Sequence, residues 1–329
     1  MEKILKRIII IFIILVAGVA AVILIKGVNT FSTVSTGESL FDPNKDKRWD
    51  VLILGNRGEK ASGGGILTDS IMVLSYEKET GKAAIVSIPR DLWIDIPGNG
   101  SQKINSAYAA GFNGKGDPKE GIRMAKEAIS EVIGLDIDFV IVVDVDALKE
   151  IVDSVGGITV HEDKWFYENF YGHEVQIRPG ENYLDGSEVL GYVGMRKYDS
   201  DFARMERQQK VVLALEEKAF SLKTLTRPDK IWNVFNSIEE NIRTDLNGSQ
   251  IQYLVKNASK FDVAEVEQVV FDNTNYLYST QSAGGAYILL PKAGDFSEIQ
   301  KVAKNIFKEG ALTEEKENKE EEEITKVGK

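Results

Sequence analysis

The sequence predicts a layered α/β domain in which helices cover both faces of a sheet. Apolar runs of strand length recur along the chain, and "DFVIVVD" at 138–144 has the uninterrupted hydrophobicity of a strand buried on both faces. These runs alternate with segments of helical periodicity, an order that is typical of helices packed against a sheet from both sides. No fixed-period repeat interrupts the pattern, so one domain is the simplest interpretation.

Three strands are predicted at the start of this domain, over 48–55, 69–76 and 82–89. The second and third are separated by "ETGK", whose residues suit a hairpin turn. A helical stretch follows at 103–111. The next helix, over 118–133, is amphipathic because its apolar residues return at helical spacing on one face.

The second half of the domain continues the alternation. The strand at 138–144 is followed by a helix over 146–155, which Gly156 and Gly157 stop, and by a strand at 158–160. Further helices are expected from near Ser187 and over 201–222, 228–242, 247–259 and 295–307, and further strands over 264–272 and 286–291. We expect the region 228–310 to complete the same sheet.

Composition excludes several classes of function. The chain contains no cysteine and only two histidines, His161 and His173, so disulfides, thiolate nucleophiles and Cys-based or His-rich metal sites are excluded. The net charge of −11 argues against broad binding to a nucleic-acid backbone, which requires a basic surplus. The carboxy-terminal "EEKENKEEEEITKVGK" has almost no apolar content and is predicted to be a disordered acidic tail.

The amino terminus predicts a membrane anchor. Residues 8–25 form an uncharged apolar run, and a helix of about 18 residues spans about 27 Å, close to the hydrocarbon thickness of a bilayer. Lys3, Lys6 and Arg7 precede the run and predict a cytoplasmic amino terminus with the body outside. A cleaved signal peptide is the alternative. The expected organisation is a cytoplasmic stub and transmembrane anchor over 1–26, a linker over 27–48, an extracytoplasmic domain over 49–310 and the acidic tail over 311–329.

A cluster of charged residues, "RKYDSDFARMERQQ", opens the helix predicted over 201–222. Asp201 suits the helix start, and Arg204 and Gln208 lie on the same stripe of the helix, with Arg196 just upstream. A helix start favours anions, and the arginine fork matches phosphate oxygens. The cluster therefore indicates a phosphate site, with a solvated helix carrying i, i+3 ion pairs as the alternative.

Polar residues also mark two strand ends. Asp69 stands at the entry to the strand at 69–76, and Arg90 and Asp91 follow the strand at 82–89. In α/β sheets ligands bind at strand ends, so these residues are candidates for the same site. Capping or turn formation is the alternative role for a lone aspartate there.

Together these segments resemble the LytR-CpsA-Psr (LCP) family of bacterial cell-envelope proteins. The matching segments, which occur in the family's order over 49–220, are "DVLILG", "TDSIMVLSY", "AAIVSIPRDLWIDIP", "KINSAYAAG", "DSVGGITV", "LDGSEVLGYV" and "MRKYDSDFARMERQQKVV". The pairing of "SIPRD" with the later "DxxRxxRQQ" is specific. A single-pass amino-terminal anchor with an extracytoplasmic body is also the family's layout.

The resemblance implies a three-layer α/β/α LCP-type mixed-sheet domain, preceded by one transmembrane helix, that binds a polyprenyl-diphosphate lipid in a hydrophobic channel. It implies transfer of the lipid-linked glycopolymer to peptidoglycan, with Mg²⁺ as the usual cofactor. Such a displacement needs cations around the phosphates and no cysteine or histidine nucleophile, since a sugar hydroxyl of the acceptor can attack.

The resemblance also implies roles for individual residues. Arg90, Arg196 and Arg204 match diphosphate-binding arginines, Gln208 matches a polar contact there, and Lys103 is a weaker match to a cationic site residue.

Two further residues match the catalytic and metal positions of the family. Asp201 matches an aspartate that orients or deprotonates the acceptor, so Asp201 and Arg90 are the catalytic candidates. Asp69 matches a metal-binding carboxylate, and Asn56 is the nearest counterpart of the second metal ligand.

The chain departs from the family pattern at three places. Asn56 is a neutral donor that would weaken a site for a hard cation, and Leu67 and Gly194 stand where the family often has arginine. A degenerate, non-catalytic binder of polyprenyl diphosphate or anionic glycopolymer is therefore an alternative, as is a hydrolase that cleaves the lipid-linked pyrophosphate. Direct DNA binding, which an older description of the family suggests, lacks a helix-turn-helix signal here.

Overall fold

The computed structural model describes residues 39, 41–42, 47–59, 65–113, 116–170, 172–195, 200–221, 241–257 and 265–308. The anchor predicted over 1–26, the tail over 311–329 and nearly all of the helix predicted over 228–242 lie outside these residues. Within the described ranges, no helix combines the length and the hydropathy needed to cross a bilayer.

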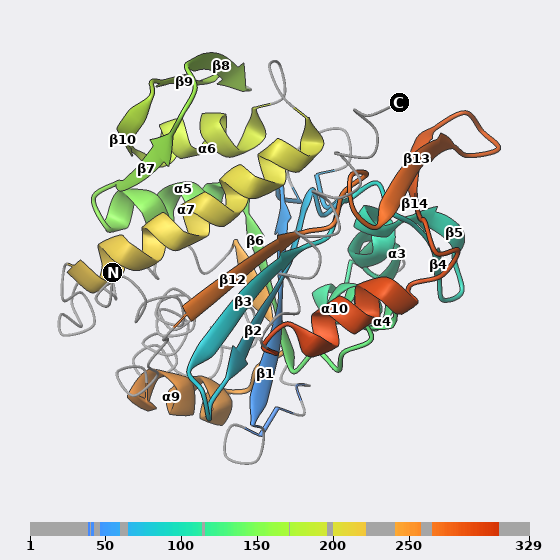
Figure 1. The fold of residues 1–329 in the computed structure, drawn as a ribbon. Helices are drawn as coiled ribbons and strands as arrows, with labels where there is room; N and C mark the ends of the chain where they lie inside the picture. Colours follow the sequence, from blue (N-terminus) through green and yellow to red (C-terminus); the bar gives the residue numbers. More distant parts are fainter. Residues whose placement is uncertain are drawn as a thin grey trace.

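A six-stranded mixed sheet forms the centre of the domain (Figure 1). Its strand order is β11-β6-β1-β2-β3-β12. The pairs β1–β6 and β3–β12 are parallel, and the other three pairs are antiparallel. The bounds are β1 Arg48–Asn56, β2 Ser70–Glu77, β3 Lys82–Ser87, β6 Phe139–Asp144, β11 Ile242–Thr244 and β12 Glu265–Val270.

Both faces of this sheet are buried. Along β1, Val51 enters one hydrophobic core, whereas the adjacent Leu52 and then Leu54 enter a second core on the opposite face. Successive side chains of a strand point to opposite faces, so a strand that feeds two cores must be covered on both. The uninterrupted apolar sequence of these strands follows from that burial.

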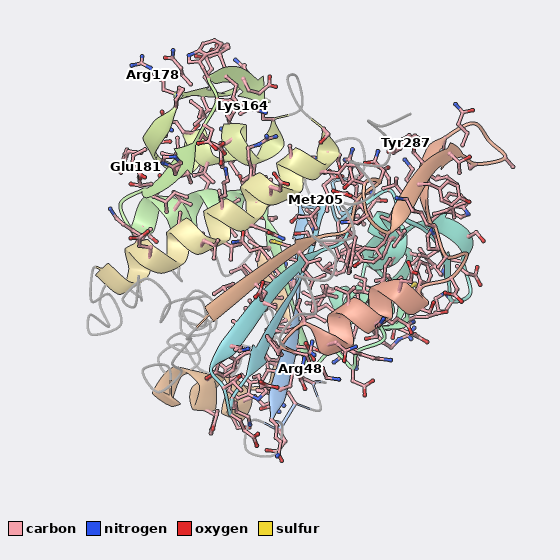
Figure 2. All side chains as sticks on the ribbon, viewed as in Figure 1. Arg48, Lys164, Arg178, Glu181, Met205 and Tyr287 are labelled. Carbon is pink, nitrogen blue, oxygen red and sulfur yellow. The ribbon has the colours of Figure 1, made fainter. Side chains whose placement is uncertain are left out.

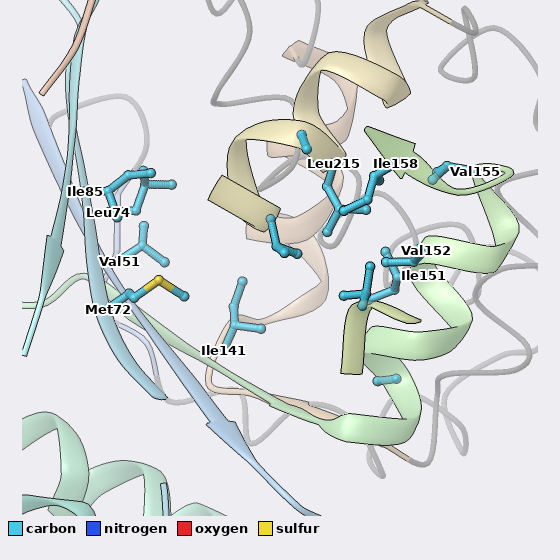
Figure 3. Close-up of a cluster of buried hydrophobic side chains, with 14 of the residues drawn as sticks. Val51, Met72, Leu74, Ile85, Ile141, Ile151, Val152, Val155, Ile158 and Leu215 are labelled. Atoms are coloured by element: carbon cyan, nitrogen blue, oxygen red, sulfur yellow. The ribbon is translucent and has the colours of Figure 1, made fainter. Parts of the chain in front are cut away.

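Helices supply the two covering layers, as predicted. Apolar residues of α5, α6, α7 and α9 join the first core, part of which is drawn in Figure 3, and those of α3, α4 and α10 join the second. Figure 1 shows α5, α6 and α7 to one side of the sheet and α3, α4 and α10 to the other. The bounds are α3 Ala107–Asn113, α4 Pro118–Ile133, α5 Val145–Ser154, α6 Gly186–Gly194, α7 Asp201–Ser221, α9 Gly248–Asn257 and α10 Ser297–Asn305.

The carboxy-terminal region completes the sheet, as expected. Strand β11 pairs with β6 and β12 pairs with β3, so both edge strands come from this region.

Within the segment predicted to be a linker, Phe41 is buried, with its ring 5.1 Å from that of Trp49. The Gln250 side chain donates to the backbone oxygens of Ser39 and Phe41. The region predicted to be a linker over 27–48 therefore contributes to the packing of the domain.

In the part of the chain that the structure describes, four two-stranded ribbons lie outside the central sheet. The strand predicted at 158–160 is β7, which belongs to one of these ribbons. It pairs with β10 and not with the central sheet. Strands β8, β9 and β10 were not predicted, since their short alternating segments, with many exposed residues, resemble loops in sequence. The bounds are β4 Trp93–Ile96, β5 Gly100–Lys103, β7 Ile158–Glu162, β8 Phe166–Phe170, β9 His173–Ile177, β10 Gly180–Leu184, β13 Leu277–Gln281 and β14 Tyr287–Pro291.

Two buried polar side chains fix α7 in place. Gln209 Nε2 donates to Ser87 Oγ at 2.8 Å and to the Val269 oxygen at 3.1 Å, which ties the helix to β3 and β12. Arg207 donates to the backbone oxygens of Tyr192 and Met195, at the end of α6. Buried polar groups need such partners, so both residues act in positioning the helix start.

The close approach of α3 and α4 gives a test of this packing. A Cβ atom at Gly111 would lie 2.2 Å from the Glu120 oxygen, so the Gly111→Ala variant must push the two helices apart. We expect it to lower the free energy of unfolding by about 1–3 kcal/mol in urea denaturation. Gly284→Ala is the control, because the nearest atom to its Cβ is 3.9 Å away. Equal stability of the two variants would contradict the packing described.

Candidate functional site

Three segments that are far apart in sequence meet where β2 begins, β3 ends and α7 begins. Arg90 Nη1 donates to Asp69 Oδ1 at 2.6 Å, and Arg90 Nε lies 3.6 Å from Asp201 Oδ2. Arg204 approaches from α7, with Nε 3.1 Å and Nη2 2.9 Å from Asp201 Oδ1. Its third nitrogen, Nη1, donates to the Asp69 backbone oxygen at 3.1 Å. Asp69, Arg90, Asp201 and Arg204 therefore form one network, called here the ion-pair network.

Lys103 reaches this network through Asp91. Lys103 Nζ lies 2.5 Å from Asp91 Oδ1, and the other carboxylate oxygen of Asp91 lies 3.7 Å from Arg90 Nε. Burial opposes the positive charge of Arg90, but the carboxylates of Asp201, Asp69 and Asp91 outweigh it and raise the pKa of Arg90 above its ordinary value. The Arg90 guanidinium is thus held charged between three carboxylates.

The Arg90 side chain keeps spare hydrogen-bonding capacity. Its Nε atom is buried and makes no hydrogen bond within the described part of the chain, because the nearest carboxylates lie beyond hydrogen-bond distance. A buried donor of this kind gains free energy when a ligand supplies an acceptor. Arg204 is only 3% exposed, and its three nitrogens already have partners.

An apolar cavity extends from the ion-pair network into the first core. Asn56, Asp69, Arg204 and Gln208 line one end of it. Its volume, open mouth included, is about 1240 Å³. The apolar part of the wall comes mainly from β1, β2, α5 and α7, with side chains that include Ile53, Met72, Leu148, Ile151, Val212 and Leu215. Figure 3 shows Met72, Ile151 and Leu215 among these side chains, between the sheet and the helices.

The structure brings together most of the residues singled out in the sequence. Asp69, Arg90, Asp201 and Arg204 share one network, which Lys103 joins through Asp91. Two more, Asn56 and Gln208, line the cavity, and Gln208 is four residues from Arg204 on the same face of α7. Arg196 lies outside the described residues. The chemical roles of all these residues stay predictions.

Asp144 belongs to the site and was missed by the motif comparison. It ends β6, stands opposite Asn56 in the parallel β1–β6 register, and lines the same cavity. Its Oδ1 accepts from the Ala147 nitrogen at 2.9 Å and so caps α5. Burial raises the pKa of Asp144 to about 6. The sequence did carry a signal for Asp144, because this residue ends the most apolar strand and ligands of α/β sheets bind at strand ends.

The oxygens near this end of the cavity fit a divalent cation poorly. Asp69 Oδ1 is held by Arg90, and Asn56 Oδ1 accepts from the Gly58 nitrogen at 2.8 Å. Among the described residues, no group of three or more His, Asp or Glu side chains could hold a metal ion. Hard cations need several oxygen ligands, so the protein alone offers Mg²⁺ an incomplete set.

The buried Asp144 carboxyl predicts a pH-dependent stability. Because its pKa is higher in the folded chain than the ordinary 3.8, ionisation weakens folding, and stability falls as the pH rises through about 6. Asp144→Asn removes the charge and keeps a good helix cap. We expect this variant to melt at a higher temperature than the unsubstituted protein at pH 8 and at nearly the same temperature at pH 4.

Asp95→Asn, which changes an exposed carboxyl in the same way, is the control for the pH series. Melting curves of the Asp144→Asn and unsubstituted proteins that shift in parallel from pH 4 to pH 8 would contradict the assignment.

Comparison with known proteins places this chain in a family. The sequence model of the LytR_cpsA_psr family matches residues 25–305. A protein of Oceanobacillus iheyensis named polyisoprenyl-teichoic acid–peptidoglycan teichoic acid transferase TagU is 33% identical over 193 residues, 58% of this chain and 57% of that protein. The Bacillus mycoides protein of the same name is 32% identical over 228 residues, 68% of each chain.

The fold also matches solved structures. A structure described as "TagT bound to LIIa-WTA" superposes with a TM-score of 0.63 and 25% sequence identity, over 83% of this chain and 98% of that one. A "Crystal structure of B. subtilis TagV" gives the same TM-score and identity over 79% of this chain and 97% of that one. With the family match covering most of its length, this chain belongs to the LytR-CpsA-Psr family.

Proposed function

We propose that the protein is a transferase that moves a glycopolymer from a polyprenyl-diphosphate lipid to peptidoglycan. The observation that carries this proposal is the continuity of the ion-pair network with the apolar cavity. A lipid diphosphate is a long apolar chain with a compact anionic head. An apolar cavity that ends at arginines offers complementary surroundings to both parts of such a molecule.

The names of the relatives support the same chemistry. The two TagU proteins are named as transferases of polyisoprenyl-linked teichoic acid to peptidoglycan, and the TagT structure is described as bound to LIIa-WTA. This chain spans 57% of the length of the Oceanobacillus protein, so the activity, the glycopolymer and the peptidoglycan acceptor are proposals for this chain.

The arginines would act on the diphosphate. In the proposed reaction an acceptor hydroxyl oxygen bonds to the phosphorus nearest the glycopolymer, and the bond from that phosphorus to the bridging oxygen breaks. The products are a phosphodiester and a polyprenyl monophosphate, and the hydroxyl proton is released. Arg90 and Arg204 neutralise the charge that grows on the phosphate oxygens, which is the main electrostatic contribution to such a step.

Asp201 is suited to orient the acceptor hydroxyl. Its carboxylate lies 2.9 Å from Arg204 Nη2 and 3.6 Å from Arg90 Nε, so it places a hydrogen-bond acceptor beside the phosphate-binding arginines. Gln208 and Lys103 would add a neutral donor and a positive charge at the edges of the head group. Arg196 is proposed to join them from the segment before α7.

Magnesium is proposed to have a small effect on this chain. Asp69 shares a carboxylate oxygen with Arg90, Asp144 accepts a hydrogen bond from the Ala147 nitrogen, and Asn56 contributes at most a neutral oxygen. We therefore assign no step of the reaction to Mg²⁺, which when bound would neutralise phosphate charge. The apolar run at 8–25 supports a single-pass anchor with the domain outside the cytoplasm, which would bring the cavity to the lipid.

A non-catalytic binder of the same lipid is the second candidate. The incomplete set of metal ligands around Asp69 and Asn56 favours it. The product separates the possibilities: incubation with a lipid-linked glycopolymer and peptidoglycan fragments yields joined polymer for a transferase, free phosphorylated polymer for a hydrolase, and no product for a binder.

Replacement of Arg90 tests the assignment of the head-group site. Arg90→Gln removes a positive charge and keeps a polar side chain, so we expect affinity for farnesyl diphosphate to fall by about ten- to a hundredfold in calorimetric titration. Arg123→Gln is the control, because that arginine pairs with Glu120 and Glu127 on the exposed face of α4. An unchanged Kd in Arg90→Gln, with a native melting curve, would refute the assignment.

Metal removal tests the magnesium proposal separately. Because the described residues offer no group of three acidic or histidine ligands, the unsubstituted chain should bind farnesyl diphosphate with less than about a threefold change in Kd between EDTA and Mg²⁺. Asn56→Asp adds a charged oxygen and should make Mg²⁺ strengthen binding. If EDTA abolished binding by the unsubstituted chain, the metal site would be complete without Asn56→Asp and our interpretation would fail.

A further inference from the structure

The β13–β14 hairpin is attached to the segment that carries Arg90. The Leu289 nitrogen of β14 donates to the Asp91 oxygen at 3.0 Å, and Leu289 forms a parallel bridge with Leu92. Both leucines are buried in the second core. The hairpin is therefore held next to Arg90, whose side chain is part of the ion-pair network.

One face of this hairpin presents Tyr287 beside the network. Tyr287 pairs with Gln281, and Leu289 pairs with Ser279, so Tyr287, Leu289 and Ser279 share a face of the ribbon. Leu289 is buried, whereas Tyr287 is 49% exposed. Figure 2 labels Tyr287 between the hairpin and the first turns of α7.

Two carboxylates of the site act electrostatically on the Tyr287 hydroxyl. Partial burial raises the pKa of Tyr287, and the negative charges of Asp91 and Asp201 raise it further, while a hydrogen bond with Ser279 lowers it. About half of the Tyr287 residue stays open to solvent. A large aromatic side chain in this state offers a ready contact surface.

The hairpin and the apolar cavity belong to different hydrophobic cores of the domain. The cavity wall comes from α5, α6, α7 and the face of the sheet that they cover. The hairpin packs instead with β4 and the second core. A lipid diphosphate with its chain in the cavity would therefore direct whatever is joined to its outer phosphate, or approaches that phosphate, towards the hairpin.

We propose that Tyr287 is a stacking surface for a pyranose ring next to the diphosphate. This inference rests on the proposed function, because it takes the lipid chain to lie in the cavity. One face of a pyranose carries C–H groups that pack on an aromatic ring, and its hydroxyls need polar partners. Asp91, whose charge acts on the Tyr287 hydroxyl, and Lys103, which pairs with Asp91, carry polar groups of this kind. The sugar belongs to the donor lipid or to the acceptor glycan, which share this chemistry.

The experiment compares ligands with and without a sugar on the full chain. Farnesyl diphosphate and farnesyl-diphospho-N-acetylglucosamine are titrated calorimetrically, together with the free disaccharide of N-acetylglucosamine and N-acetylmuramic acid. The variants are Tyr287→Ala, Tyr287→Phe and, as a matched control, Tyr278→Ala. Tyr278 is a 44% exposed tyrosine on the opposite face of the same hairpin.

We expect the unsubstituted protein to bind one of the two sugar-bearing ligands about three- to tenfold more tightly than the Tyr287→Ala variant does, because of the Tyr287 contact. Tyr287→Ala loses that gain, while Tyr287→Phe and Tyr278→Ala keep most of it, and farnesyl diphosphate binds equally to all four proteins. A loss confined to the lipid-linked sugar identifies the donor, and a loss confined to the free disaccharide identifies the acceptor.

Equal affinity of Tyr287→Ala and the unsubstituted protein for both sugar-bearing ligands would overturn this inference and leave the proposed function intact. Failure of the unsubstituted protein to bind farnesyl diphosphate would refute the proposed function, and the inference would fall with it.

Discussion

The ion-pair network of Asp69, Arg90, Asp201 and Arg204 is the constraint on which the site depends. It joins the start of β2, the end of β3 and the start of α7, which are separated by up to 135 residues in the Arg204–Asp69 contact. Arg204 is nearly fully buried, and removal of one partner from a buried pair leaves an uncompensated charge. The network therefore holds the α7 start against the sheet and forms the polar end of the cavity.

Each arginine of the ion-pair network is balanced by a carboxylate. Asp69 and Asp201 occupy donors that a diphosphate would use, so an anionic ligand competes with them for Arg90 and Arg204. Binding of a diphosphate would exchange one anionic partner of these arginines for another. The buried Nε of Arg90 is a donor that such a ligand could satisfy without displacing a carboxylate.

Much of the fold could be predicted from the sequence because its signals are local. The apolar run at 138–144 and the capped amphipathic helix α4 appear where their patterns place them. The ion-pair network could be anticipated only by motif, since pairing between Arg90 and Asp201 depends on tertiary packing. Tyr287 carried no sequence signal, because a tyrosine in a short strand is ordinary and its meaning comes from the Leu289–Asp91 contact.

The most direct test of this account is a crystal structure of the protein with a bound short-chain polyprenyl diphosphate. The account predicts the isoprenoid chain in the cavity between β1, β2, α5 and α7, and the phosphates within hydrogen-bond distance of Arg90 and Arg204. A lipid bound elsewhere on the surface, with this cavity closed or empty and the two arginines still paired only with aspartates, would contradict it.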